Sequence, residues 1–265
     1  MTKNKSELAM TADQVKAYSD KALFFPSTLE IETTTHCNIN PPCVMCYPRI
    51  FDKRKFKGEI DKVAFERLIP HMKKFNTISL HGVGEPLIGN KLFTILNNLD
   101  TEKTCVQFNS NGLMLTEDIS RLLIKKKLSL IDFSIDAASA ITYQKIRRSD
   151  FLQVTNNIKR LSELKKEMKV KHPVIMLNMT LMKENLPEAV SFIEMAIQLG
   201  AEIVHFGLLN PFKEYQIEHG GFIFNYKDQM IALNSSIFKK TIDLAKQKAA
   251  ELGIKLSLEF SRYYS

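Results

Sequence analysis

The chain has 265 residues, and 45% of them are hydrophobic, so it can bury the core of a substantial globular domain. It has no run of about 18 apolar residues and its first residues, 1–9, are polar, so we expect neither a transmembrane helix nor a signal peptide, and a cytoplasmic location. The formal net charge of +8 comes from 37 Lys and Arg against 29 Asp and Glu. Much of this excess lies in short runs such as Lys125–Lys127, which suit helix ends facing water. A preference for an anionic substrate or a nucleic acid is the alternative, and the charge alone identifies no partner.

Short apolar segments rich in branched residues alternate with longer segments of helical period. The predicted strands are Leu29–Thr35, Thr77–Gly82, Thr104–Asn109, Leu130–Asp136, Val174–Leu181 and Glu202–Leu209. The predicted helices are Lys62–Phe75, Lys91–Leu99, Glu117–Lys127, Ile141–Arg147, Leu152–Met168 and Pro187–Leu199. Six strand-then-helix units predict an α/β fold with a parallel sheet. A complete eight-unit barrel takes about 250 residues, so we predict a partial (β/α)6 barrel, with a flat doubly wound sheet as the alternative.

Two segments flank this predicted core of residues 29–210. Residues 1–28 are predicted to form an N-terminal helical extension, with one helix over Ala12–Ala22. Residues 211–265 are predicted to contain an irregular loop, a helix near Gln229–Leu252 and a short strand at Ile254–Phe260. This irregular loop is rich in aromatic residues, and it is the candidate for a lid over the open side of the barrel.

Three of the four cysteines, Cys37, Cys43 and Cys46, follow the first predicted strand directly. Their clustering indicates a metal site in a reducing compartment rather than a disulfide framework. Loops after the strand ends build the active site of a parallel barrel. Three thiolates can bind three irons of a [4Fe–4S] cubane and leave the fourth iron open for catalysis. A zinc site with His36 as the fourth ligand is the alternative.

Glycine-rich or polar motifs also follow the next three predicted strands and the next helix. They are Gly82-Val83-Gly84-Glu85, Asn109-Ser110-Asn111-Gly112, Ser134-Ile135-Asp136-Ala137 and Tyr143-Gln144-Lys145-Ile146-Arg147. Glycines let the backbone approach a ligand closely, and strand residues two apart share a face. Each motif alone has an ordinary reading as a turn or a helix end. Together they mark the ends of successive strands, where a barrel enzyme places its chemistry.

The order of these motifs resembles the radical S-adenosylmethionine (SAM) superfamily over residues 29–209. The usual cysteine spacing of that family is C-x3-C-x2-C, whereas this chain has C-x5-C-x2-C with two extra residues around Pro41-Pro42. The other motifs are similar to the family's G-x-G-E-P-L, T-N-G, S-I-D-G and Y-x-x-I-R segments and follow in the same order. The resemblance implies a [4Fe–4S] cluster on Cys37, Cys43 and Cys46, with SAM as the second cofactor.

The resemblance also implies a set of SAM-binding residues at the strand ends. These candidates are Gly84, Glu85, Ser110, Ser134, Asp136, Arg147 and Asn178. Glu85 would accept hydrogen bonds from the SAM ammonium. Arg147 would pair with the SAM carboxylate, because a guanidinium matches a carboxylate in a bidentate fork.

Several polar residues of this region have structural alternatives. Either Asp136 or Ser139 can cap the helix that follows the fourth strand. Asn178 can be a buried amide whose hydrogen bonds are satisfied within the protein. We expect a structural role for His205 and a solvent-facing position for Arg148.

The implied reaction is reductive cleavage of SAM to methionine and a 5′-deoxyadenosyl radical, which takes a hydrogen atom from the substrate. The implied partners are a small-molecule or peptide substrate and a one-electron donor such as a flavodoxin or a ferredoxin. The motifs most resemble the branch that carries a SPASM or twitch extension with auxiliary clusters. No cysteine follows Cys105, which we place in the core, so we predict one cluster in this chain. A zinc- or cluster-binding module and an inactive truncated core acting as a scaffold are the other hypotheses.

Overall fold

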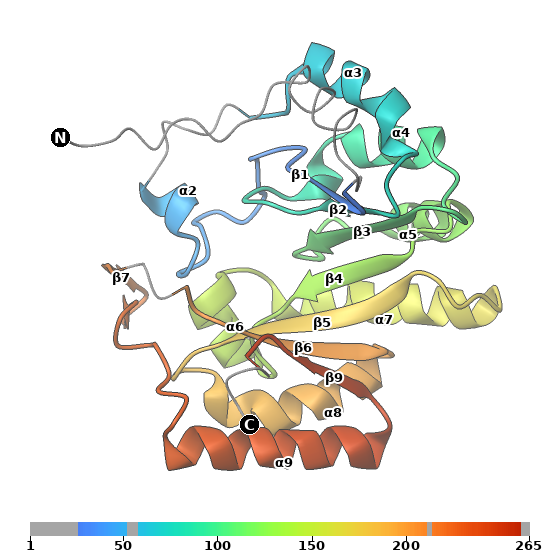
Figure 1. Cartoon of the computed structure of the whole chain (residues 1–265). Coiled ribbons are helices and arrows are strands. Elements are labelled where there is room, and N and C mark those ends of the chain that lie inside the picture. Colours follow the sequence, from blue (N-terminus) through green and yellow to red (C-terminus); the bar gives the residue numbers. More distant parts are fainter. Residues whose placement is uncertain (1–25, 52–57, 211–213, 261–265) are drawn as a thin grey trace.

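A computed structural model describes residues 26–51, 58–210 and 214–260. Seven parallel strands form one sheet in the order β1-β2-β3-β4-β5-β6-β9 (Figure 1). The strands are β1 (Thr28–Ile31), β2 (Thr77–Leu80), β3 (Cys105–Ser110), β4 (Leu130–Ser134), β5 (Val174–Leu181), β6 (Ile203–Leu208) and β9 (Lys255–Leu258). The predicted partial barrel of six units is confirmed, and the predicted C-terminal strand extends it by pairing with β6.

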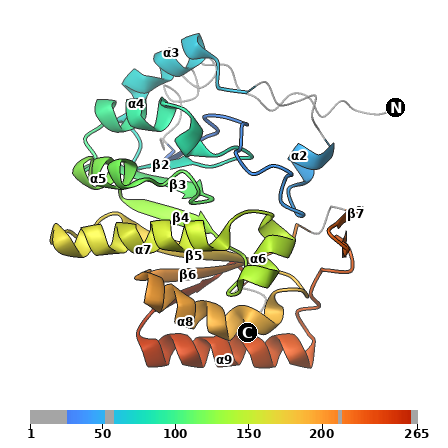
Figure 2. The same cartoon turned by 180° about the vertical axis from the view of Figure 1, so that it is seen from behind.

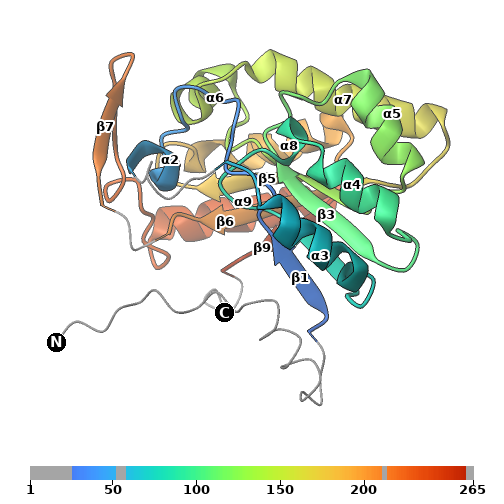
Figure 3. The same ribbon diagram turned by 90° about the horizontal axis from the view of Figure 1, so that it is seen from above.

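The helices lie mainly on one side of this sheet. They are α2 (Tyr47–Phe51), α3 (Lys62–Met72), α4 (Lys91–Asn98), α5 (Glu117–Lys125), α6 (Ala140–Arg147), α7 (Phe151–Glu167), α8 (Ala189–Leu199) and α9 (Ser236–Leu252). Figure 2 shows α4, α5, α7 and α8 in front of the strands, and Figure 3 shows α3 to α8 along the same side. The helix predicted over Ala12–Ala22 lies outside the described residues. Among the described helices, none combines the length and apolar character needed to cross a bilayer.

Alternate residues of the strands face opposite sides of the sheet. Buried and half-buried residues alternate along β3 and β5, as a strand with one covered face requires. The buried set, including Phe108 and Phe133, packs with the helices in the main hydrophobic core. We call the side opposite the helices the inner face. Its polar residues on β3 to β6 are Gln107, Asn109, Asp132, Ser134, Asn178, Thr180 and His205.

The irregular loop predicted near the start of residues 211–265 contains a β-hairpin instead over residues 216–225. Gln216–His219 (β7) and Phe222–Asn225 (β8) pair as an antiparallel hairpin. Gly220 and Gly221 join them with φ angles of 55° and 77°. A two-residue hairpin turn of type I′ needs positive φ at both central positions, which glycine adopts without strain.

This hairpin packs against the loop that carries the three cysteines. The Tyr215 hydroxyl, just before β7, donates a hydrogen bond of 2.6 Å to the Val44 carbonyl. Phe224 and Tyr226 are buried in a small hydrophobic cluster that also contains Val44 and Ile146. The aromatic segment predicted to be a lid therefore supports the cysteine loop from one side.

A buried asparagine ties the end of β4 to the end of β5. The Asn185 amide donates to the carbonyl oxygens of Asp136 and Thr180, at 2.9 Å each. Its side-chain oxygen accepts a 2.8 Å hydrogen bond from the Met182 backbone. Asn185 is fully buried, so water cannot replace these partners if the side chain is lost.

We expect Asn185→Ala to lower the free energy of unfolding by about 2–4 kcal/mol, because buried backbone groups at the ends of β4 and β5 would lose their hydrogen-bond partner. Asn98→Ala is the matched control, since Asn98 is exposed and its amide donates a hydrogen bond to the Thr94 carbonyl. Urea unfolding of both variants measures the difference. Equal, small losses in the two variants would contradict the role assigned to Asn185.

Candidate functional site

Hydrogen bonds to residues 58–60 fix the start of the cysteine loop, directly after β1. The Thr35 backbone donates to the Gly58 carbonyl at 2.7 Å, and the Ile60 backbone donates to the Thr33 carbonyl at 3.1 Å. The Thr35 hydroxyl also donates to the Gly58 carbonyl at 3.1 Å. The loop then continues past the three cysteines into α2, which lies near the hairpin at the same end of the sheet (Figure 1).

Each cysteine sulfur of this loop has an N–H donor from another residue. The pairs are Cys37 with the Asn111 amide at 3.7 Å, Cys43 with Arg147 Nη1 at 3.7 Å, and Cys46 with the Arg49 backbone N–H. Hydrogen bonds of this kind stabilise negative charge on metal-bound thiolates and tune the metal. The surroundings of the three sulfurs therefore suit thiolate ligands.

Burial acts against the thiolate form of two of these cysteines. Burial raises the pKa of Cys43 to about 11, and the Arg147 guanidinium acts in the opposite direction. Burial also raises the pKa of Cys46. The neighbouring thiolates raise both values further, so deprotonating the set needs a compensating positive charge. Iron in a cluster supplies such charge, because metal binding and thiol deprotonation are coupled.

A site for one metal ion and a site for a cubane place different demands on the three cysteines. Across the described ranges, no three His, Cys, Asp or Glu side chains are gathered closely enough to hold one metal ion. A cubane makes a different demand, because its three thiolates bind three different irons. His36, the ligand of the zinc alternative, lies with its ring against Gly58.

Glu85 fastens the loop after β2 to the loop after β3. Its side chain is 2% exposed, and its carboxylate accepts hydrogen bonds from the Asn111 backbone at 2.7 Å, the Ser110 hydroxyl at 3.0 Å and the Leu87 backbone at 3.2 Å. Its own backbone N–H donates to the His36 carbonyl at 2.7 Å. Burial raises the pKa of Glu85 to about 7, against the effect of these three donors.

Gly84 lies against the backbone of the cysteine loop. A Cβ atom at this position would collide with the carbonyl oxygens of Thr34 and His36. The glycine therefore permits the close approach that brings Glu85 under the loop. The glycine thus lies at a contact between two loops, and its place beside a ligand stays a prediction.

Asp136 and Arg147 form a buried pair beside Cys43. Arg147 Nε lies 2.5 Å from Asp136 Oδ2, although the N–H is not aligned for a hydrogen bond, so the attraction is Coulombic. The other Asp136 oxygen accepts a 2.6 Å hydrogen bond from the Thr180 backbone. Burial disfavours the charged guanidinium, but Asp136 and Cys43 together hold the pKa of Arg147 above its usual range.

The structure decides between the two possible caps of α6. Ser139 caps the helix by accepting a 3.2 Å hydrogen bond from the Thr142 backbone, and Asp136 turns toward Arg147 instead. Asp136 has a φ of 61°, which is unusual outside glycine and redirects its side chain at the end of β4. Ser134 and Asn178 are register partners on β4 and β5 and lie on the inner face.

The structure also shows where His205 and Cys105 lie. His205 on β6 contacts the Ser257 hydroxyl at 3.1 Å, consistent with the structural role expected for it. Cys105 begins β3, at the end of that strand remote from Asn111 and the cysteine loop. It is half-buried rather than fully in the core.

The expectation that Arg148 faces solvent is wrong. Arg148 ends α6 in the left-handed conformation, with a φ of 57°, and donates a 3.1 Å hydrogen bond to the Pro42 carbonyl. Arg49 and Asn111 were also missed as supports of the loop: Arg49 donates to the Ile39 carbonyl at 2.7 Å, and Asn111 to the Asn38 amide oxygen at 2.7 Å. The sequence places Asn111 in the T-N-G-like motif, which is the signal that could have identified it.

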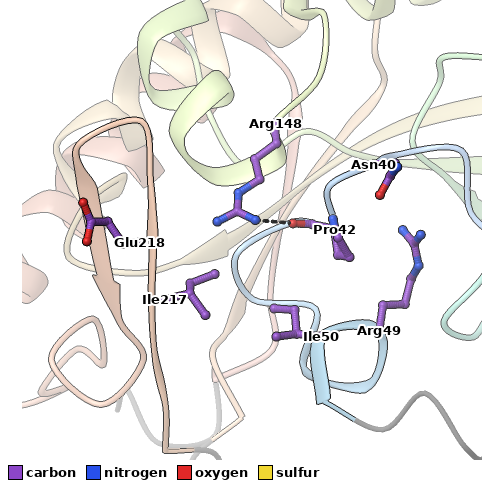
Figure 4. A pocket seen from close by; sticks show the side chains of 7 residues that line it. All are labelled: Asn40, Pro42, Arg49, Ile50, Arg148, Ile217 and Glu218. Atoms are coloured by element: carbon purple, nitrogen blue, oxygen red, sulfur yellow. Dashed lines mark hydrogen bonds between the residues drawn. The ribbon is translucent and has the colours of Figure 1, made fainter.

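A cleft of about 390 Å³ separates the cysteine loop from the hairpin (Figure 4). Its lining residues are Asn40, Pro42, Arg49, Ile50, Arg148, Ile217 and Glu218. Figure 4 shows Arg148 reaching Pro42 across this cleft, with Glu218 on the hairpin opposite. Both guanidinium groups of the cleft hold backbone carbonyls of the cysteine loop.

The raised pKa of Glu85 predicts a pH-dependent stability. Stability from this group is fully present below the unfolded value of 4.5 and is lost as the pH rises through about 7. Between pH 5 and pH 8, the wild-type protein should therefore lose about 2–3 kcal/mol relative to Glu85→Gln. Urea unfolding of the cluster-free proteins measures this. The exposed variant Glu117→Gln should follow the wild type, and parallel curves for wild type and Glu85→Gln would contradict the assignment.

Comparison with known proteins places this geometry in a family. A family model described as the radical SAM superfamily matches residues 31–218. The cofactor-modifying protein for the tungsten-containing aldehyde ferredoxin oxidoreductase of Pyrococcus furiosus is 22% identical over 196 residues, which cover 71% of this chain and 53% of the relative. The chain spans about half the length of the curated relatives it matches.

Solved structures share the fold at low sequence identity. SuiB of Streptococcus suis, bound to its precursor peptide SuiA, gives a TM-score of 0.68 at 13% identity and covers 94% of this chain and 53% of SuiB. The protein anSMEcpe with bound AdoMet and the Kp18Cys peptide gives 0.63 at 17% identity, covering 89% of this chain and 64% of that protein. The family match extends over well more than half of the sequence and the fold agrees with it. The chain therefore belongs to the radical SAM superfamily, whose enzymes use a [4Fe–4S] cluster and SAM.

Proposed function

We propose that this chain cleaves SAM reductively and removes a hydrogen atom from a peptide or small-molecule substrate. The observation that carries the proposal is the cysteine loop at the end of the parallel sheet, with an N–H donor for each of its three sulfurs. When bound, the reduced cluster and SAM supply a carbon radical that abstracts hydrogen. The protein binds and orients these groups and keeps competing reactions out.

The cluster ligands in this proposal are Cys37, Cys43 and Cys46. Asn111 and Arg147 donate N–H groups to two of these sulfurs, so they stabilise thiolate charge and limit where the sulfurs can move. With three protein ligands, one iron of a cubane stays open for SAM.

Glu85 is the proposed acceptor for the SAM ammonium. A carboxylate offers about four lone-pair sites, and three are used by the protein donors, so one site remains for a ligand N–H. Arg147, held in place by Asp136, is the proposed partner of the SAM carboxylate. Ser110 and Gly84 position these groups, whereas Ser134 and Asn178 offer polar atoms on the inner face.

A peptide substrate is supported by the neighbours of the fold. SuiB is known in a complex with its precursor peptide, and anSMEcpe in complexes with peptides and AdoMet. The partner for the electron is a donor of the flavodoxin or ferredoxin class, since the proposed reaction consumes one electron for each SAM cleaved. We place this activity in the cytoplasm, where thiols stay reduced.

Anaerobic reconstitution should give about four irons and four sulfides per chain, as expected for one cubane. Cys43→Ala should abolish the cluster and, with dithionite as reductant, the formation of 5′-deoxyadenosine from SAM. Cys105→Ala is the matched control and should keep both, because Cys105 lies at the other end of β3. Iron and sulfide analysis and chromatography of the nucleoside measure these outcomes. Stoichiometric zinc without iron uptake would refute the proposed cofactor.

Replacing Glu85 tests the SAM site. Glu85→Ala should keep the cluster but weaken SAM binding about tenfold to a hundredfold, since loss of a charge-assisted hydrogen bond costs about 1.5–3 kcal/mol. Equilibrium titration of the reconstituted protein with SAM measures the affinity, and Glu117→Ala on the exposed face of α5 is the control. Unchanged affinity at full iron content would show that Glu85 only fastens the loops together.

A further inference from the structure

Asp132 is a buried carboxylate, and only one of its two oxygens accepts hydrogen bonds from the described residues. The residue is 6% exposed and lies in the middle of β4. Its Oδ2 accepts hydrogen bonds from the side-chain amides of Asn109 at 2.9 Å and Asn178 at 3.2 Å. Its Oδ1 is buried and has no hydrogen-bond partner among the described residues. Burial raises the pKa of Asp132 to about 6, so most of the group is ionised at neutral pH.

The carboxylate is directed to the inner face. Ile131 and Phe133, its neighbours along β4, pack with the helices in the main core, so strand alternation turns Asp132 the other way. Both of its amide donors come from the adjoining strands on that same face. Ser134, a proposed SAM-binding residue, lies two positions further along β4 on the same face. Asp132 is therefore about 6.6 Å from it along the strand, on the side away from the strand end.

Among the residues that the structure describes, no basic side chain forms an ion pair with Asp132. Arg147 favours its charged form from a distance, but the close ion pair of Arg147 is with Asp136. His205, which shares the inner face, has its pKa lowered by burial and is therefore neutral at pH 7. A buried charge with an empty acceptor site is costly unless a partner arrives.

We propose that Asp132 binds a primary ammonium group of the substrate. A cation satisfies both the charge and the free acceptor at Oδ1, whereas a neutral donor satisfies only the acceptor and an anion is repelled. The inference rests on the proposed function, because it takes the inner face beside the cofactors as the place where substrate binds. A lysine in a peptide and a free alkylamine present the same primary ammonium group.

Asp132→Asn is the informative substitution. The asparagine carbonyl can take the place of Oδ2 and accept from both Asn109 and Asn178, so these hydrogen bonds are kept. The asparagine NH₂ then lies where Oδ1 was and presents a donor to the ligand instead of an acceptor. Asp118→Asn on the exposed side of α5 is the matched control for loss of one carboxylate.

The probes are acetyl-Gly-Lys-Gly-amide, the same peptide with norleucine in place of lysine, and n-butylamine. NMR titration of the SAM-loaded holoenzyme measures their binding, and thermal unfolding checks that each variant is folded. We expect the wild type and Asp118→Asn to bind the lysine peptide at least tenfold more tightly than the norleucine peptide. In Asp132→Asn this ratio should fall toward one. Binding of n-butylamine as tight as that of the lysine peptide would identify a small amine as the ligand.

The wild type alone can overturn the inference, even if the variant does not fold. Equal affinity for the lysine and norleucine peptides, or a lysine preference retained in folded Asp132→Asn, would refute it. Formation of 5′-deoxyadenosine by the wild type without any probe tests the proposed function separately. SAM cleavage without ammonium selectivity would reject the role of Asp132 and leave the proposed function standing.

Discussion

The buried ion pair between Asp136 and Arg147 is the interaction on which the rest of the site depends. Burying two charges costs more than their attraction returns unless further hydrogen bonds satisfy them. Here Asp136 also accepts from the Thr180 backbone, and Arg147 also contacts the Cys43 sulfur. The pair joins the end of β4, the end of α6 and the cysteine loop. It fixes a positive charge at the place where thiolates must be stabilised.

The same loop is also contacted by Glu85, which forms no ion pair among the described residues. Glu85 receives three protein N–H or O–H donors, and its backbone reaches the cysteine loop at His36. Such a closely fitted contact is possible because Gly84 has no side chain. Arg147 and Glu85 thus both contact the cysteine loop, Arg147 at the Cys43 sulfur and Glu85 through its backbone at the His36 carbonyl. These contacts position the three cysteines together with the groups proposed to hold SAM.

The sequence predicted the sheet and the order of the motifs because strand alternation and helical period are local properties. It could not predict that Arg148 and Arg49 hold carbonyls of the cysteine loop, since these contacts depend on how separate segments approach in space. The hairpin was missed although its turn, Gly220–Gly221, carries a recognisable signal, because the flanking aromatic residues obscured the alternation. Local sequence patterns therefore predict where the strands end. Which side chains contact each other at those ends depends on the packing of segments that are distant in the sequence.

The inner face departs from the rule that a strand in the middle of a sheet is apolar on its buried positions. Asn109, Asp132 and Asn178 occupy three neighbouring strands and satisfy one another only in part, because both amides donate to the same oxygen. Stability alone would favour apolar residues there, as on the helix side at Phe133. A buried polar atom without a hydrogen-bond partner lowers the stability of the fold. Such atoms are characteristic of sites where a bound ligand supplies the missing hydrogen bond. The arrangement is therefore better explained by binding than by folding.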